Sequence, residues 1–391
     1  TTVRDEPRAG APAGDPAEER EQAGQRPAAT TPREVTLLET VNDGGVHEIP
    51  AGSYFVALAQ PYAANVRALF EPQVYPERRT ATGAAERPYD VAGWTLPMQM
   101  GVETKLLRAV REPAGRRPMT LLRDENEVRR DLGLRPRGQG AASPVENPVR
   151  GSARLALYRS WTGSMDEGWT RYVFDTFNVP FETLRDREVR AGNLRAKYDV
   201  VVLPSMRMRE IVEGRSRETA PAEFAGGITD AGVENLRRFV EEGGTLVCFD
   251  ASAELAIRGF KLPLRNVLAG VPTSEFYGPG SILRLEVDTA HPLARGLAKD
   301  VDAYFINSSA FEMTGPDAVQ RVRVVARYAE RDPLRSGWLL GERYLAGKIA
   351  LAEVPLGRGR VVLFGFRPQH RGQTWGTFPF IWNAIGRREN D

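Results

Sequence analysis

The chain has 391 residues, 41% of them hydrophobic and 27% charged, a composition typical of globular domains. Its 53 basic and 51 acidic residues give a net charge of +2, so the basic excess of a nucleic-acid-binding or membrane-surface protein is excluded. A single cysteine excludes an internal disulfide, and no run approaches the ~18 apolar residues of a membrane-spanning helix.

The N-terminal third predicts little regular structure. Residues 1–33 are rich in Ala, Pro, Gly and charge and nearly lack large apolar side chains, so they cannot bury enough surface to offset their ordering entropy. We predict that they are disordered or a linker. Residues 34–110 predict a small α+β extension, with strands at 34–41 and 52–59 and a helix at 61–70.

Two irregular segments follow. Residues 88–103 contain Pro and Trp without a regular period, which predicts irregular structure. Residues 111–150 are rich in Arg, Pro, Gly and Glu and predict a flexible linker.

Residues 151–391 alternate strand and helix patterns. The predicted strands are at 154–159, 198–205, 245–249, 281–288, 322–329, 347–357 and 359–366, and the predicted helices are at 165–179, 228–244 and 377–386. Such alternation predicts a doubly wound α/β domain with a largely parallel sheet, and the later strands predict β-rich C-terminal additions.

The cysteine, Cys248, falls inside a predicted strand. A nucleophile elbow holds its reactive residue on a sharp turn, usually beside glycine. Val247 and Phe249 flank Cys248 and suit such a turn poorly, so a buried, inert thiol is expected. If the turn after this strand forms an elbow, Asp250 to Ser252 occupy it.

The chain offers few groups for acid–base or metal chemistry. Its three histidines are His47, His291 and His370, and only His370 follows the last strong strand, where a base could serve the edge of a sheet. Neither an HxxE nor an HExxH motif occurs. We therefore predict no catalytic residue and no metal ligand in this chain.

A ligand crevice is expected where the loops after successive parallel strands converge. Trp161 would offer an apolar face to a sugar or peptide, with directional hydrogen bonds from small polar groups and a carboxylate contact from an arginine. The candidate ligand-binding residues are Trp161, Ser205, Asp250, Ser252, Arg367 and His370. The alternative is that these side chains only pack in their own loops, which would favour a role in assembly.

Two segments carry a family resemblance. Residues 44–76 ("GGVHEIPAGSYFVALAQPYAANVRALFEPQVYP") and 87–102 ("RPYDVAGWTLPMQMGV") resemble the region that follows the catalytic domain in bacterial zinc carboxypeptidase-like proteins, relatives of carboxypeptidase A. Residues 151–391 resemble the flavodoxin-like, class I glutamine amidotransferase-like domain that follows in such proteins. The residues that carry this likeness are "YDVVVLPS", "GVENLRRFVEEGGTLVCFD" and "GRGRVVLFGFRPQHRGQTWGTFPFIWNAI".

This chain lacks the catalytic residues of both families, and that difference determines the function that we expect. The family's zinc ligands and catalytic glutamate would lie in a domain upstream of Thr1, so the resemblance implies zinc as a cofactor of that domain and none in this chain. The amidotransferase motif has a Gly-flanked Cys and a Glu two positions after its His, where this chain has Gly372.

We therefore expect the non-catalytic C-terminal portion of a zinc carboxypeptidase-like protein, with a degenerate amidotransferase-like domain for substrate binding or assembly. Its expected partners are the upstream peptidase domain of the same polypeptide, a peptide or sugar ligand, and further copies of itself. The resemblance implies an exported protein, and the start at Thr1 rather than Met fits a piece of a longer polypeptide. Two alternatives stay open: an independent hydrolase or amidotransferase using Cys248 or Ser252, and a carbohydrate- or cell-wall-binding module.

Overall fold

The computed structural model describes two main stretches and several short segments of the chain. The described residues are 53–88, 91–110, 147–151 and 153–386, with the segments 33–34, 38–40, 46–47, 118–119, 126–127 and 130. The chain divides into two compact units, of which unit one comprises residues 1–67 and 104–143 and unit two comprises residues 68–103 and 144–391. The predicted division differs, because it placed residues 68–103 in the extension. All six candidate ligand-binding residues belong to unit two.

Unit one contains short paired strands. β2 (Leu38–Thr40) pairs antiparallel with β3 (Val46–His47) and with β4 (Leu107–Val110), and β1 (Arg33–Glu34) pairs with β5 (Pro118–Met119). The segments 1–33 and 111–150, predicted as disordered or linker, lie mostly outside the described residues.

The region before residue 71 confirms one predicted element and corrects another. The helix predicted at 61–70 is confirmed as α2 (Ala63–Phe70). The strand predicted at 52–59 is wrong, since residues 53–57 are irregular and a bend follows, with Gln60 N donating to Leu58 O at 2.9 Å. An alternating pattern becomes a strand only where a neighbouring strand completes its hydrogen bonds, and no described strand pairs here.

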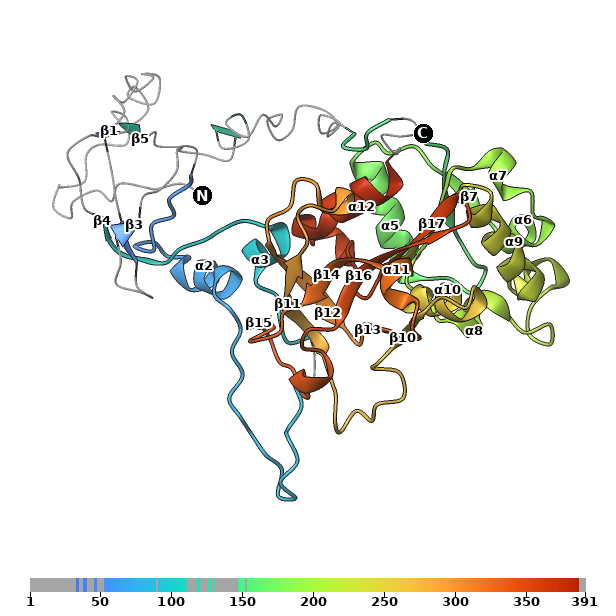
Figure 1. Ribbon diagram of the computed structural model, residues 1–391. Helices are drawn as coiled ribbons and strands as arrows, with labels where there is room; N and C mark the ends of the chain where they lie inside the picture. Colours follow the sequence, from blue (N-terminus) through green and yellow to red (C-terminus); the bar gives the residue numbers. More distant parts are fainter. Residues whose placement is uncertain are drawn as a thin grey trace, which may run out of the picture. The chain divides into compact units, whose positions relative to one another are not determined.

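A mixed sheet forms the centre of unit two (Figure 1). Five neighbouring strands are parallel: β7 (Glu182–Leu184), β6 (Leu155–Tyr158), β8 (Val200–Leu203), β9 (Thr245–Phe249) and β17 (Gly359–Phe364), in that order. Beyond β17 the strands are antiparallel: β16 (Ile349–Leu356), β14 (Arg323–Tyr328), β11 (Pro279–Val287) and β12 (Asp300–Ile306). Three short strands, β10 (Leu264–Asn266), β13 (Phe311–Met313) and β15 (Leu334–Ser336), pair beside this path.

Helices cover both faces of the parallel strands. Val200 and Val202 of β8 belong to one hydrophobic cluster, with α5 (Met165–Thr176) and α12 (Phe378–Ile385). Val201 and Leu203 belong to the other cluster, with α6 (Asp186–Ala191), α7 (Leu194–Lys197), α8 (Met208–Val212), α9 (Thr229–Glu241) and α10 (Ala253–Gly259). Burial on both faces explains why these strands are continuous apolar runs in the sequence. None of the helices in the described residues has the length and apolar character needed to cross a membrane.

The mixed α/β fold with parallel strands is thus confirmed, as are the main predicted elements. The predicted strands at 154–159, 198–205, 245–249, 281–288, 322–329, 347–357 and 359–366 correspond to β6, β8, β9, β11, β14, β16 and β17, and the predicted helices at 165–179, 228–244 and 377–386 correspond to α5, α9 and α12. A short helix, α11 (Ala318–Arg321), precedes β14.

Residues 68–103 are tied to the antiparallel end of this sheet. Ala92 N and Gly93 N both donate to Gly280 O, at 2.9 and 2.8 Å. The hydroxyls of Thr95 and Ser336 lie 2.8 Å apart in a buried contact. These contacts explain why the segment belongs to unit two, although its sequence reads as an extension.

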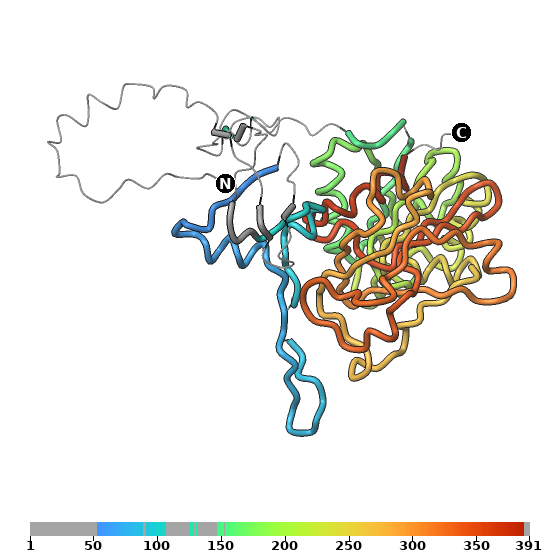
Figure 2. The backbone as a smooth tube through the Cα atoms, turned by 60° about the vertical axis from the view of Figure 1, so that its left-hand side comes forward, coloured from blue at the N-terminus to red at the C-terminus, as the bar shows by residue number. Residues whose placement is uncertain are grey.

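Two features stand out within this segment. Residues 71–88 form a long loop (Figure 2) whose tip is closed by Thr80 N donating to Ala84 O at 2.8 Å. The prediction that residues 88–103 are irregular throughout is wrong at α3 (Leu96–Met100). Pro97 in the first turn and the left-handed Gly101 at the C-cap, with φ of 68°, favour this short helix despite the lack of a regular period.

Cys248 lies at the centre of the parallel strands. Its register partners are Leu203 of β8 and Leu363 of β17, and its side chain is fully buried. Burial raises the pKa of the thiol above its ordinary value, so the nucleophilic thiolate does not form at neutral pH.

The folded protein should therefore resist labelling of Cys248 by iodoacetamide at pH 7 and should react only on unfolding. Cys248→Ala should lower the free energy of unfolding by roughly 1–2 kcal/mol, since only a small buried side chain is lost. Mass spectrometry of native and urea-unfolded samples measures the first, and urea titration the second. Rapid labelling of the native protein would contradict the buried position.

Candidate functional site

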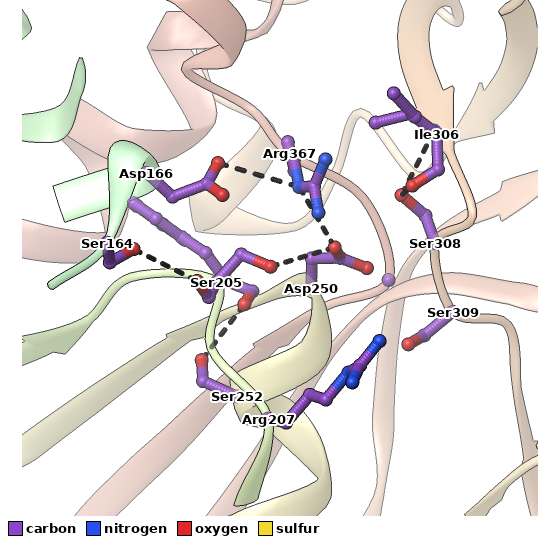
Figure 3. Close-up of polar contacts among 12 residues, drawn as sticks. Ser164, Asp166, Ser205, Arg207, Asp250, Ser252, Ile306, Ser308, Ser309 and Arg367 are labelled. Atoms are coloured by element: carbon purple, nitrogen blue, oxygen red, sulfur yellow. Dashed lines mark hydrogen bonds and ion pairs between the residues drawn. The ribbon is translucent and has the colours of Figure 1, made fainter. Parts of the chain in front are cut away.

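Four loops converge at the carboxyl ends of the parallel strands (Figure 3). Ser164 caps the start of α5, after β6, and its hydroxyl donates to Ser205 O, after β8, at 3.4 Å. Ser205 Oγ in turn donates to Asp250 Oδ2, after β9, at 2.9 Å. Arg367, after β17, completes the group. The predicted meeting of these loops at one edge is therefore present.

Asp250 occupies the sharp turn directly after β9. It opens the short 3₁₀ helix Asp250–Ser252 with φ of 51°, a left-handed conformation that is uncommon for residues other than glycine and is tolerated best by Asn and Asp. A strand that ends in a strained turn and continues into a helix is the geometry of a nucleophile elbow. The elbow thus carries Asp250, and Cys248 lies two residues before it in the strand.

Asp250 is held by an ion pair. Arg367 Nε lies 3.2 Å from Asp250 Oδ2 and 3.5 Å from Asp166 Oδ1 in the first turn of α5. Figure 3 shows Arg367 between the two carboxylates. Asp250 is only 1% exposed, and its Oδ1 has no hydrogen-bond partner in the described structure. Arg367 Nε likewise has no well-aligned hydrogen bond, so charge rather than hydrogen-bond geometry holds the pair together.

The ionisation of both carboxyls follows from this burial. Burial raises the pKa of Asp250 to about 6, although Arg367 and the Ser205 hydroxyl favour the charged form. Burial also raises the pKa of Asp166, and Arg367 opposes that shift. The nearby Asp166 carboxylate adds to the raised pKa of Asp250, because two like charges close together disfavour ionisation.

The remaining predicted residues lie apart from this pair or face inward. The hydroxyl of Ser252 is fully buried and lies within hydrogen-bond distance of the carbonyl oxygens of Leu203 (3.0 Å) and Phe249 (2.9 Å). Trp161 is 36% exposed, but the Arg185 guanidinium lies 3.9 Å from its ring centroid, so one face of the ring is covered. The Phe224 ring also packs against this indole, with centroids 4.7 Å apart and planes 64° apart.

His370 is placed as a packing residue. Its ring stacks on Tyr304 with centroids 3.9 Å apart and planes 13° apart, and its side chain is buried. Burial lowers the pKa of His370 to about 3, and the nearby cations Arg367 and Arg371 add to this shift. The imidazole is therefore neutral at pH 7.

The sequence did not predict the contribution of α5. Ser164 and Asp166 lie at the start of a predicted helix that follows the first strand, so their place in the chain could have indicated this edge. Which strand-end group each would contact depends on tertiary packing.

Two cavities in the described structure lie away from this edge. One of about 490 Å³ lies between the loop that carries Arg79 and Arg87 and the segment 338–340. Another of about 310 Å³ lies beside Asp288 and residues 324–327. Among the described residues, no group of three or more His, Cys, Asp or Glu side chains is placed to hold a metal ion.

Comparisons with known proteins give fold similarity only. No protein-family model and no curated protein matches the sequence. Among solved structures, the β-galactosidase from Bacillus circulans sp. alkalophilus is 14% identical over 61% of this chain, with a TM-score of 0.36. A ThuA-like protein from Bacteroides uniformis ATCC 8492 is 11% identical over 64% of this chain and 97% of its own, with a TM-score of 0.36. An exo-β-1,4-mannosidase from Opitutaceae bacterium strain TAV5 is 8% identical over 59% of this chain, with a TM-score of 0.35. The chain spans 31% of the β-galactosidase and 35% of the mannosidase. At these values the similarity identifies no function.

The raised pKa of Asp250 makes stability depend on pH in a defined direction. Because the folded pKa of about 6 lies above the ordinary 3.8, the contribution of protonated Asp250 is full below pH 3.8 and is lost as pH rises through 6. The loss should be on the order of 3 kcal/mol in the wild type. Asp250→Asn, which cannot ionise, should flatten this part of the profile of unfolding free energy against pH.

Urea unfolding at several pH values between 4 and 7 measures this difference. Asp230→Asn, an exposed position on α9, is the matched control and should follow the wild type. Identical profiles for Asp250→Asn and the wild type would show that Asp250 is not a buried, titrating carboxyl.

Proposed function

We propose that residues 151–391 form a doubly wound, flavodoxin-like domain of the class I glutamine amidotransferase-like type. The strand order supports this: with β6 as the first strand, the parallel strands β7, β6, β8, β9 and β17 run 2-1-3-4-5, the flavodoxin-like order. Helices on both faces of these strands agree with a doubly wound arrangement.

We propose further that this domain is catalytically degenerate. The elbow position carries Asp250 in place of the Gly-flanked cysteine of amidotransferases, and Asp250 is ion-paired with Arg367. His370 is stacked on Tyr304, and the residue two positions on is Gly372. A nucleophile and base within hydrogen-bond reach, as nucleophilic catalysis requires, are therefore lacking among the described residues of this edge.

Assembly is the role that this geometry supports better than ligand binding. The observation that carries it is that Ser205, Asp250 and Ser252 are all less than 10% exposed and bonded to groups of the chain itself. A binding site needs a concave space lined by convergent polar groups, and the two cavities described above are lined by residues of other segments.

The sequence resemblance supports a larger context for this role. Residues 44–76 and 87–102 resemble the region that follows the catalytic domain of zinc carboxypeptidase-like proteins. In this proposal the chain is the non-catalytic C-terminal portion of such a protein, and the zinc and the catalytic groups belong to the peptidase domain that it accompanies.

The two alternative functions find less support. A hydrolase using Cys248 or Ser252 would need a reachable nucleophile, and both side chains are fully buried. A sugar-binding module using Trp161 would need an open ring, and both the Arg185 guanidinium and the Phe224 ring pack against that indole.

The purified chain should release no C-terminal residue from peptides and no ammonia from glutamine, with or without added zinc. Rates should equal those of the His370→Ala variant and of buffer alone, since the described residues supply neither a triad nor a metal site. Mass spectrometry of peptides and an ammonia assay measure both activities. Zinc-dependent release that His370→Ala abolishes would overturn the proposal.

A further inference from the structure

The outer face of α5 is apolar where a surface helix is normally polar. Met165, Trp169 and Tyr172 follow one another at helical spacing and are 84%, 37% and 54% exposed. The side of the helix that faces the sheet buries Val173 and Phe174. The helix therefore has a second apolar side that the described residues leave uncovered.

Trp375 extends this surface beyond the helix. It is 42% exposed, its Nε1 donates to Gly372 O at 3.0 Å, and its ring packs on Phe177 at the C-cap of α5. Tyr172 also lies against Gly372, since a Cβ placed on that glycine would come within 2.8 Å of the tyrosine ring. We call the surface formed by Met165, Trp169, Tyr172 and Trp375 the α5 face.

Gly168 lies beside this face, three residues after Met165 and four before Tyr172. A Cβ added there would meet nothing within 4 Å, so the folded chain has room for a larger residue. Glycine is among the least favourable residues inside a helix, and its use is explained where another backbone must approach closely. An open glycine between Met165 and Trp169 is thus an independent indication that something packs on α5.

The charges of α5 indicate how a helix that packs on it would be oriented. Both acidic residues of its first turn suit the positive end of the helix dipole, but its last turn has no basic residue and carries the exposed Asp175. A carboxylate at this end is unfavourable in the isolated helix. It becomes favourable beside the N-terminal end of a second, antiparallel helix, because Asp166 and Glu167 of that end are already paired with Arg367 and Arg171 of their own copy.

We infer that the α5 face is the interface between two copies of this chain, with the two α5 helices antiparallel across a two-fold axis that passes between Gly168 and Trp169. This axis sets Met165 against Tyr172 of the other copy, a sulfur–aromatic contact, and Gly168 against Trp169 of the other copy. It also sets Asp175 beside the N-terminal end of the other α5. One patch is complementary to itself, as a two-fold interface requires.

The exposed area of the α5 face agrees with the area that a second copy of the chain would cover. An aromatic side chain has roughly 150–250 Å² of surface, so at their exposed fractions the four side chains leave on the order of 500 Å² in water. That area matches the apolar core of one partner's share, about 800 Å², of a standard interface. The inference deepens the proposed assembly function and rests on it, because it names a second copy as the partner.

The full chain should form a dimer whose fraction rises with concentration in sedimentation velocity experiments between about 1 and 100 µM. Trp169→Asp should weaken the dimer at least tenfold, because it places a charge at the centre of the seam. Gly168→Leu should do the same although it adds apolar surface, because it blocks the approach of the other backbone. Gly168→Leu therefore distinguishes close packing of the two helices from non-specific hydrophobic association, which added apolar surface would strengthen.

Val319→Asp is the matched control, since Val319 is 76% exposed on α11 and lies outside the α5 face. It should dimerise like the wild type, and circular dichroism with thermal unfolding should show that all three variants fold. A monomeric wild type, or a dimer that neither Trp169→Asp nor Gly168→Leu weakens, would overturn the inference. A monomer without peptidase or glutaminase activity would overturn the dimer inference and leave the non-catalytic assignment intact. A dimer with either activity would overturn the non-catalytic assignment and leave the dimer inference intact.

Discussion

The charge contact between Asp250 and Arg367 organises the carboxyl edge of the parallel strands. Asp250 stands on the turn after β9, Arg367 follows β17, and Arg367 also reaches Asp166 at the start of α5. One guanidinium thus joins a strained turn, the last parallel strand and a helix. Burying an unpaired carboxylate is very costly, so the turn that carries Asp250 depends on its partner. The same contact fills the edge at which open α/β sheets usually bind ligands.

A filled edge and an open helix face give one consistent account of the domain. Asp250, Ser205 and Ser252 are committed to partners within the chain, whereas Met165, Trp169 and Tyr172 remain in water. Side chains that satisfy one another add stability but offer little to a ligand. Exposed apolar side chains have the opposite property, because covering them is favourable whenever a complementary surface is present. These two features are the basis of the proposed role, in which the domain holds partners together.

Much of the fold could be predicted from the sequence, because strands buried on both faces are continuous apolar runs and α9 has a clear apolar stripe. The edge could be predicted in part: chain order places Ser205 and Asp250 after neighbouring strands, and Arg367 after the last parallel one. The direction in which each side chain points could not be predicted from the sequence. Trp161 turns toward Arg185 and His370 stacks on Tyr304, and both choices depend on residues distant in the sequence. The strand predicted at 52–59 failed for the same reason, since pairing needs a neighbour that local alternation does not reveal.

A double-mutant cycle tests the central claim that Arg367 is committed to Asp250. The free energy of unfolding at pH 7 would be measured by urea titration for the wild type, Asp250→Asn, Arg367→Met and the double variant. For a committed, largely buried pair the coupling energy should exceed about 1 kcal/mol. The exposed pair Arg209–Glu213, treated in the same way, should show a much smaller coupling. A coupling between Asp250 and Arg367 no larger than that of the exposed pair would contradict the account, because Arg367 would then be free to serve a ligand at this edge.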